Sequence, residues 1–266
     1  ATAESELISA ITTLSESNIT DLVLDLRYNS GGYLAIASQL AYMIAGPSAS
    51  GQTFELLQFN DKHPSTNPVT GNALTPTPFY SNSIGLSVSE GSALPYLNLS
   101  RVFVLTSADT CSASEAIMNG LRGIDVEVIQ IGGTTCGKPY GFYGLDNCGT
   151  TYFSLHFKGV NAKGYGDYSD GFSPVNTATV EGEPLPGCAV SDDYEHALGD
   201  ANEAMLSAAL NYRSTSGSCP ALPVALSEMK NARSSKATTV TIGEAPLSKM
   251  QRPNVPGRVA LKRQNH

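Results

Sequence analysis

The feature that most constrains the fold is a pair of short apolar runs with a helical pattern between them. The runs read RVFVLTS (101–107) and VEVIQIG (126–132), and their length and β-branched residues favour buried strands over helices. Residues 112–122 between them have helical spacing. A strand, a helix and a second strand in this order predict the parallel unit of a layered α/β fold.

An earlier segment has a similar pattern. DLVLDLR (21–27) predicts a strand buried on both faces, and YNSGG (28–32) supplies glycines for a sharp turn. A helical pattern follows, with apolar side chains at Ile36, Leu40, Met43 and Ile44. Because open α/β sheets place their sites beyond the carboxyl ends of strands, the segments after 21–27 and 101–107 are where we expect a functional site.

The rest of the chain adds further elements around this unit. We predict a helix at 3–16 and strands at 53–59 and 150–157. The strand at 53–59 lies within 47–98, a stretch rich in Pro, Gly, Ser, Thr and Asn that predicts a long surface excursion. A last helix is predicted to begin at Asp200, with Glu203 three residues on as in a capping box, and to run to about Tyr212.

Size and composition indicate one sizeable core. The chain has 266 residues, of which 41% are hydrophobic, and one core of that size fits a single catalytic domain. No stretch approaches the roughly 18 apolar residues of a membrane span. The start, ATAESELISA, lacks the basic and apolar regions of a signal peptide. We therefore expect a soluble chain, either a mature form or a fragment.

Charge is unevenly distributed along the chain. Residues 1–225 hold 8 Lys and Arg against 22 Asp and Glu, whereas residues 226–266 hold 8 against 2. The acidic body argues against nucleic acid or an anionic membrane surface as the main partner. Residues 216–266 are predicted to form an extended basic tail, which charge attraction would hold against the body.

Five cysteines bear on the compartment rather than on a metal. They form no CxxC pair and no cluster with histidine at zinc spacing, so we expect no metal site. Two pairs bracket turn-rich segments, namely Cys136 with Cys148 and Cys188 with Cys219. The odd number leaves at least one thiol free, and the sequence leaves the connectivity open. Disulfides would imply an oxidising compartment.

The segment TCSASEA (110–116) carries the first candidate for chemistry. Ser112 could be only a helix N-cap, because a hydroxyl there satisfies free N–H groups of the first turn. It could instead be a nucleophile, because those N–H groups and the positive end of the helix dipole favour an oxyanion. Both interpretations stay open from this segment alone.

A serine nucleophile needs a base, and the sequence offers two candidates. His156 lies on the predicted strand 150–157, where ordinary packing is the alternative, and no histidine stands in a Ser-His-Asp pattern. Lys138 lies in GGTTCGKPYGFYG (132–144), among Gly, Pro and aromatic residues. Loss of hydration there would favour the neutral amine that can take a proton. The alternative for Lys138 is a surface side chain in a hairpin.

Three motifs in order resemble a known family. LVLDLRYNSGG, VFVLTSADTCSASEAIMNGLRG and VEVIQIGGTTCGKPYGF resemble the C-terminal processing, or tail-specific, serine peptidases of family S41. Two later segments, NAKGYGDYSDGFSPV and DDYEHALGDANEAMLSAAL, resemble a bacterial envelope branch, so the resemblance covers about residues 3–215. It implies an α/β fold with a layered ClpP/crotonase-like β-β-α protease core.

The resemblance also implies roles for individual residues. Ser112 is implied as the nucleophile and Lys138 as the general base. The oxyanion hole is implied to come from the backbone N–H of Ala113 and that of Gly31 or Gly32. Glu115, one helical turn beyond Ser112, could orient the dyad, or could simply complement the helix dipole.

This chain departs from the family pattern in two ways. Many members carry a glutamine four residues after the lysine to hold its amine, and here that position is Phe142. The family also often carries a helical region and a PDZ module ahead of the first strand, and neither fits ahead of 21–27. We therefore expect an S41-like catalytic domain at 1–215 that lacks those parts, and a tail at 216–266.

The expected function is that of a serine endopeptidase. Ser112 and Lys138 would hydrolyse peptide bonds of polypeptides near their C-termini, without metal or cofactor, in the bacterial periplasm or cell envelope. One alternative is a non-catalytic module on the same fold that binds peptides or hydrophobic ligands. Another is a Ser112–His156 hydrolase of small esters. The oligomeric state is left open.

Overall fold

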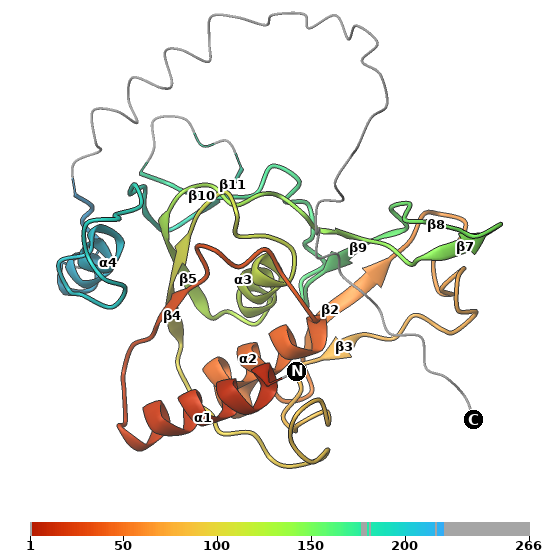
Figure 1. The fold of residues 1–266 in the computed structure, drawn as a ribbon, viewed down its shortest axis with the longest axis horizontal. Helices are drawn as coiled ribbons and strands as arrows, with labels where there is room; N and C mark the ends of the chain where they lie inside the picture. The colour runs from red at the N-terminus through yellow and green to blue at the C-terminus, as the bar shows by residue number, and fades with distance from the viewer. Residues whose placement is uncertain (1, 177–179, 181, 216, 221–266) are drawn as a thin grey trace, which may run out of the picture.

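A four-stranded parallel sheet forms the centre of the computed structural model, which describes residues 2–176, 180, 182–215 and 217–220 (Figure 1). The predicted tail at 216–266 falls outside the described residues, except for 217–220. The strand order is β1-β4-β5-β12. The strands are β1 (Val23–Asp25), β4 (Arg101–Thr106), β5 (Glu127–Gly132) and β12 (Gly187–Cys188). Helix α3 (Ala113–Gly123) connects β4 to β5, so the predicted strand-helix-strand unit is confirmed.

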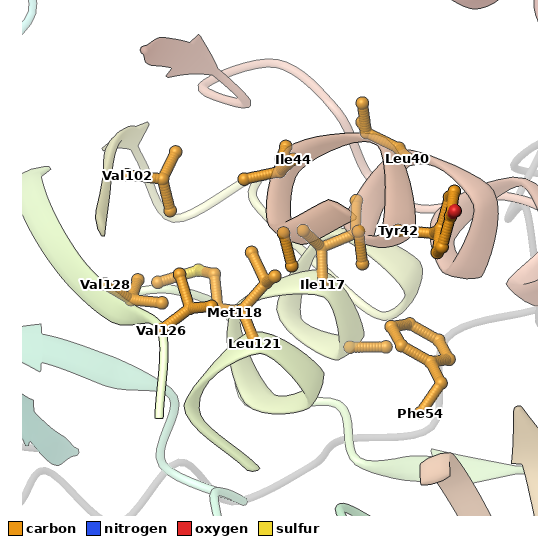
Figure 2. Packing of buried hydrophobic residues seen from close by; sticks show 14 of the residues in the cluster. Leu40, Tyr42, Ile44, Phe54, Val102, Ile117, Met118, Leu121, Val126 and Val128 are labelled. Atoms are coloured by element: carbon orange, nitrogen blue, oxygen red, sulfur yellow. The ribbon is translucent and has the colours of Figure 1, made fainter. Parts of the chain in front are cut away.

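Side-chain alternation along β4 gives this sheet two buried faces. Val102 and Val104 face α2 (Leu34–Ala45) and α3, and Figure 2 shows Val102 beside Ile44 of α2 and near the apolar side chains of α3. Phe103 and Leu105 lie in a second apolar cluster with α4 (Ala204–Ser214). Because successive strand residues point to opposite faces, one short run fills both cores. The fold is therefore a mixed α/β arrangement with helices on both sides of the sheet.

A second, antiparallel sheet packs on the side of α3 that faces away from the parallel sheet. Its order is β3-β2-β9-β6, with β2 at Thr53–Gln58, β3 at Thr77–Pro78, β6 at Tyr140–Gly141 and β9 at Phe157–Val160. The contact with α3 is close, because a Cβ on Gly120 would lie 2.6 Å from the ring of Phe54. Helix α3 thus lies between two sheets, which fixes the direction of its N-terminus.

Smaller elements complete the molecule. They are α1 (Ala3–Glu16), the 3-10 turn η1 (Gly46–Ala49), the hairpin of β7 (Leu145–Asn147) and β8 (Thr150–Tyr152), and the pair β10 (Phe172–Pro174) and β11 (Glu183–Leu185). The β7–β8 hairpin projects away from the body (Figure 1). Within the described residues, no helix has the length and apolar character to cross a membrane.

Two predicted strands differ from the structure. The segment 21–27 is not buried on both faces, because β1 is a three-residue edge strand whose Asp25 is exposed. The single strand predicted at 150–157 is two strands, since β8 pairs only with β7 in the exposed hairpin whereas β9 pairs with β2 and β6. The residues between them, 153–155, are exposed. Alternation in the sequence could not reveal that the pairing partners change.

The last helix begins later than its predicted cap. Its N-cap is Glu203, whose carboxylate accepts hydrogen bonds from the N–H groups of Met205 and Leu206. Asp200 instead accepts from the N–H of Asn202 in the preceding turn. The shift follows from Glu203 also pairing with a buried arginine, described below, which holds that carboxylate at the helix start.

One of the two suggested disulfides is confirmed and the other is wrong. Cys188 is bonded to Cys219 as suggested. Cys136 is bonded to Cys111 instead of Cys148, and Cys148 is an exposed free thiol. The reason is topological, because the parallel strands β4 and β5 end at the same edge and leave the Cα atoms of Cys111 and Cys136 5.3 Å apart. Cys148 lies away from that edge, between β7 and β8.

Candidate active site

Ser112 lies at the strand-to-helix turn between β4 and α3, in an unusual backbone conformation. It is the N-cap residue of α3, with φ 57° and ψ −110°. An ordinary N-cap is extended, and a positive φ is uncommon in any residue but glycine. Strained turns of this kind present nucleophiles in some hydrolases. The side chain is fully buried. Ser112 is thus an N-cap by position, but its conformation is not what capping alone requires.

The glycine turn after β1 packs directly against Ser112. A Cβ on Gly31 would lie 2.9 Å from the Cβ of Ser112 and 3.3 Å from the backbone nitrogen of Ala113. Gly31 also has φ 121°, which L side chains rarely adopt. The space beside Ser112 and the Ala113 amide therefore depends on the missing side chain at Gly31.

Asn29 joins the glycine turn to the Ser112 segment. Its backbone oxygen accepts hydrogen bonds from the N–H of Cys111 at 3.2 Å and from the hydroxyl of Ser114 at 2.9 Å. Its side-chain oxygen accepts from the N–H of Gly31 at 2.9 Å and from the same Ser114 hydroxyl at 3.0 Å. Asn29 was not among the predicted site residues. An Asn in a glycine turn does indicate such a role, because Asn side chains in turns commonly accept a hydrogen bond from the backbone N–H two residues on.

Glu115 joins the Ser112 segment to the Lys138 segment. Its buried carboxylate accepts hydrogen bonds from the N–H of Ser112 at 2.9 Å and the N–H of Lys138 at 2.8 Å. It also accepts from the N–H of Gly137 at 2.8 Å and the hydroxyl of Thr135 at 2.6 Å. Bonds to an ionised acceptor are stronger than neutral ones. Glu115 therefore positions the backbone of both segments, which is more than either sequence interpretation assigned to it.

The Lys138 side chain reaches an aromatic ring. Its Nζ lies 5.9 Å from the centroid of the Phe142 ring, within cation–π range. Phe142 in turn contacts Phe153 edge to face, with centroids 5.4 Å apart. Lys138 itself is partly buried. A phenyl ring therefore stands beside the amine. The direct pairing of Lys138 with Ser112 stays a prediction.

His156 is held in a way that disfavours it as a base. Its Nδ1 accepts a hydrogen bond from the N–H of Tyr143 at 3.2 Å. A neutral imidazole that accepts at Nδ1 carries its proton on Nε2, so Nε2 cannot take a second proton from serine in that tautomer. The ring also packs edge to face on Tyr143. These contacts favour the packing interpretation of His156 over a Ser112–His156 hydrolase.

Arg27, just before the glycine turn, is a buried arginine that three carboxylates hold in place. Arg27 is 1% exposed and pairs with Asp25 at 2.7 Å, Asp192 at 2.9 Å and Glu203 at 2.8 Å. The hydrogen bond to Asp25 raises the pKa of Arg27, which therefore stays charged. The hydroxyl of Tyr28 donates to Asp192 at 2.6 Å, and this bond raises the pKa of Tyr28 to about 12. This cluster was not predicted, because Asp192 and Glu203 lie far along the chain from Arg27.

The model of peptidase family S41 matches residues 1–141, which is more than half of the 266 residues and includes the glycine turn, Ser112 and Lys138. The chain belongs to peptidase family S41.

Two solved structures are similar to the S41 chain. A protein from Bacteroides fragilis assigned to the S41 proteases is 27% identical, with a TM-score of 0.62 over 79% of the S41 chain and 49% of its own. The photosystem II D1 C-terminal processing protease is 19% identical, with a TM-score of 0.46 over 66% and 39%. The S41 chain thus spans about half the length of the Bacteroides protein. A comparison with curated proteins found no significant match.

Proposed function

We propose that the S41 chain is the catalytic unit of a serine endopeptidase that uses Ser112 and Lys138. Ser112 Oγ attacks the peptide carbonyl while the Lys138 amine takes its proton. The C–N bond then breaks, the leaving amine receives that proton, and water hydrolyses the acyl-enzyme. The observation that carries the proposal is the position of Ser112 at a strained turn, with the glycine turn against it and the Lys138 segment tied to it through Glu115.

The oxyanion hole is proposed to use the N–H groups of Ala113 and Gly32. The nitrogen of Ala113 adjoins the space that a side chain on Gly31 would fill. The N–H of Gly31 already donates to Asn29, which favours Gly32 among the two glycines of the turn. Two backbone donors aimed at a developing oxyanion can account for a large share of the rate enhancement.

Phe142 is proposed to stabilise the ammonium that forms on Lys138. When the amine accepts the serine proton it gains a positive charge, and the ring of Phe142 presents its electron-rich face within 5.9 Å. An aromatic ring would then do for this chain what the amide oxygen of glutamine does in relatives that carry it.

The substrate is proposed to be a polypeptide cut near its C-terminus. Membership of family S41 supports a peptidase, and two disulfides support an oxidising compartment such as the bacterial periplasm or envelope. The catalytic unit is proposed to be residues 1–215 on a ClpP/crotonase-like core. Because Ser112 is fully buried, productive binding requires a local opening around it.

The test is cleavage of an unfolded protein by variants of the two reacting residues. Ser112→Ala and Lys138→Ala are expected to abolish cleavage while the far-ultraviolet circular dichroism stays unchanged, and Lys62→Ala, at an exposed lysine, serves as the control. Cleavage retained by both variants would exclude the dyad.

The burial of Ser112 also favours a second candidate, a non-catalytic module that binds peptides or hydrophobic ligands. A fluorophosphonate distinguishes the two, because it reacts only with an activated serine. Covalent labelling at Ser112 supports the peptidase. Tight binding of an unfolded protein, with neither labelling nor cleavage, supports the binding module.

A further inference from the structure

A disulfide joins the two segments that carry the proposed dyad. Cys111 directly precedes Ser112, and Cys136 lies two residues before Lys138. The bond therefore connects the end of the segment after β4 to the loop after β5, within a few residues of both reacting side chains. Its location is more specific than general stabilisation of the fold requires.

The loop that bears Lys138 is held by hydrogen bonds rather than by membership of a helix or strand. Residues 134–139 form neither helix nor strand. The loop is held on the Ser112 side by the hydrogen bonds to Glu115 and by one from the N–H of Cys136 to the oxygen of Thr110 at 3.1 Å. Further bonds hold the other side of the loop, from the N–H of Thr135 to the oxygen of Phe172 at 3.0 Å and from the N–H of Gly159 to the oxygen of Pro139 at 3.0 Å. The disulfide is the covalent link between the segment of the base and the segment of the nucleophile.

We propose that the Cys111–Cys136 disulfide is a positioning element for Lys138, and that its reduction by a dithiol slows turnover without unfolding the chain. This inference rests on the proposed function. In the reduction, a dithiol such as dithiothreitol transfers two electrons and two protons to the disulfide. The products are two cysteine thiols and the oxidised, cyclic form of the reagent.

The two disulfides differ in their accessibility, which makes a selective experiment possible. Cys136 is exposed and Cys111 is partly buried, whereas in the other disulfide Cys219 is partly buried and Cys188 is fully buried. A thiolate must reach a sulfur atom to attack it, so mild dithiothreitol is expected to open Cys111–Cys136 first. The Cys188–Cys219 bond ties β12 to the segment after α4, away from Ser112, and provides a matched control.

The experiment measures peptide cleavage by the full chain in a Cys148→Ser background, which removes the free thiol that could exchange with either disulfide. Reduction is expected to lower kcat by about 10- to 100-fold, because small misplacement of a catalytic group has effects of that size. KM should stay within about 2-fold of its value before reduction, because contacts that bind substrate and transition state equally are not changed. Reoxidation should restore kcat. The C111S/C136S variant should be slow and insensitive to dithiothreitol, whereas C188S/C219S should keep the wild-type kcat.

Amide hydrogen exchange tests the inference without relying on peptide cleavage. Reduction should accelerate exchange at residues 135–138 while exchange in β4 and β5 stays unchanged. An unchanged kcat with unchanged exchange at 135–138 would overturn the inference, as would acceleration throughout β4 and β5, which would make the bond a support of the fold. If the oxidised chain neither cleaves peptides nor reacts with a fluorophosphonate, the proposed function fails, and the exchange measurement still decides whether the disulfide orders the Lys138 loop.

Discussion

The carboxylate of Glu115 accepts a hydrogen bond from the backbone N–H of Lys138 at 2.8 Å. The same carboxylate accepts the N–H of Ser112 at 2.9 Å. One buried side chain on α3 therefore sets the spacing between the segment of the proposed nucleophile and the segment of the proposed base. The helix that presents Ser112 also orders the loop that presents Lys138.

Replacing Glu115 with glutamine tests this link. All four groups bonded to the carboxylate are donors. In either orientation, the glutamine amide therefore directs its NH₂ group at two of these donors. We expect Glu115→Gln to lower the free energy of unfolding by about 2–4 kcal/mol, because buried donors lose their acceptor. Urea denaturation measures this. Glu90→Gln, at an exposed position, should change it little, and an equal effect in both variants would contradict the link.

A methyl group on Gly31 should block the site. Its Cβ would lie 2.9 Å from the Cβ of Ser112, so the turn or the serine must move. We expect Gly31→Ala to reduce kcat/KM for peptide cleavage by about 100-fold. Gly51→Ala provides the control, since Gly51 also has a positive φ but no atom within 4 Å of an added Cβ. If both variants lost activity equally, backbone strain rather than the contact with Ser112 would be responsible.

Removing the aromatic ring beside Lys138 should slow the proton transfer. Phe142→Leu keeps apolar bulk but removes the cation–π contact, which contributes about 0.5–1 kcal/mol at an exposed site. We expect kcat to fall by about 2- to 5-fold. Phe142→Tyr keeps a ring and should retain most of the activity in steady-state peptide assays. A rate in the leucine variant equal to wild type would mean that the ring does not assist Lys138.

Arg27 should be important for stability in spite of its distance from the chemistry. Arg27→Leu leaves the fully buried carboxylate of Glu203 without its cation, and breaking a buried pair in this way costs about 3–5 kcal/mol. Thermal and urea unfolding should both show the loss. Arg213→Leu removes an exposed pair with Asp21 and should cost about 1 kcal/mol or less. Similar losses in the two variants would argue against the anchoring role of Arg27.

Glu4 should make the free energy of unfolding depend on pH in the acidic range. Burial alone would raise its pKa, but hydrogen bonds from Gln39 and from three backbone N–H groups of the 84–87 segment outweigh it, and the pKa is lowered from 4.5 to about 2. Because the folded pKa is the lower one, the stabilisation is present above about pH 4.5 and lost as the pH falls toward 2. It amounts to about 3 kcal/mol.

Urea unfolding at several pH values checks this prediction. Glu4→Gln should be less stable than wild type at pH 7 and should lose less stability than wild type between pH 4.5 and pH 2. Glu6→Gln, on the exposed side of α1, should follow the wild-type pH dependence. Parallel curves for wild type and Glu4→Gln would show that Glu4 is not the titrating group.

The order of strands and helices around the site could be predicted from the sequence, as could the candidates Ser112, Gly31 and Lys138. These conclusions rest on local properties, namely hydrophobic periodicity, helix capping and the conformational freedom of glycine, together with a resemblance in motif order. The catalytic roles stay predictions.

Which segments contact one another became visible only in the folded chain. The Cys111–Cys136 bond, the four donors around Glu115 and the carboxylates around Arg27 each join residues from separate elements. The division of 150–157 into β8 and β9 likewise depends on pairing with separate elements, since β8 pairs with β7 and β9 pairs with β2. Parallel strands bring their carboxyl ends together whatever the number of residues between them, so neither the spacing of cysteines nor a local charge pattern could reveal these contacts.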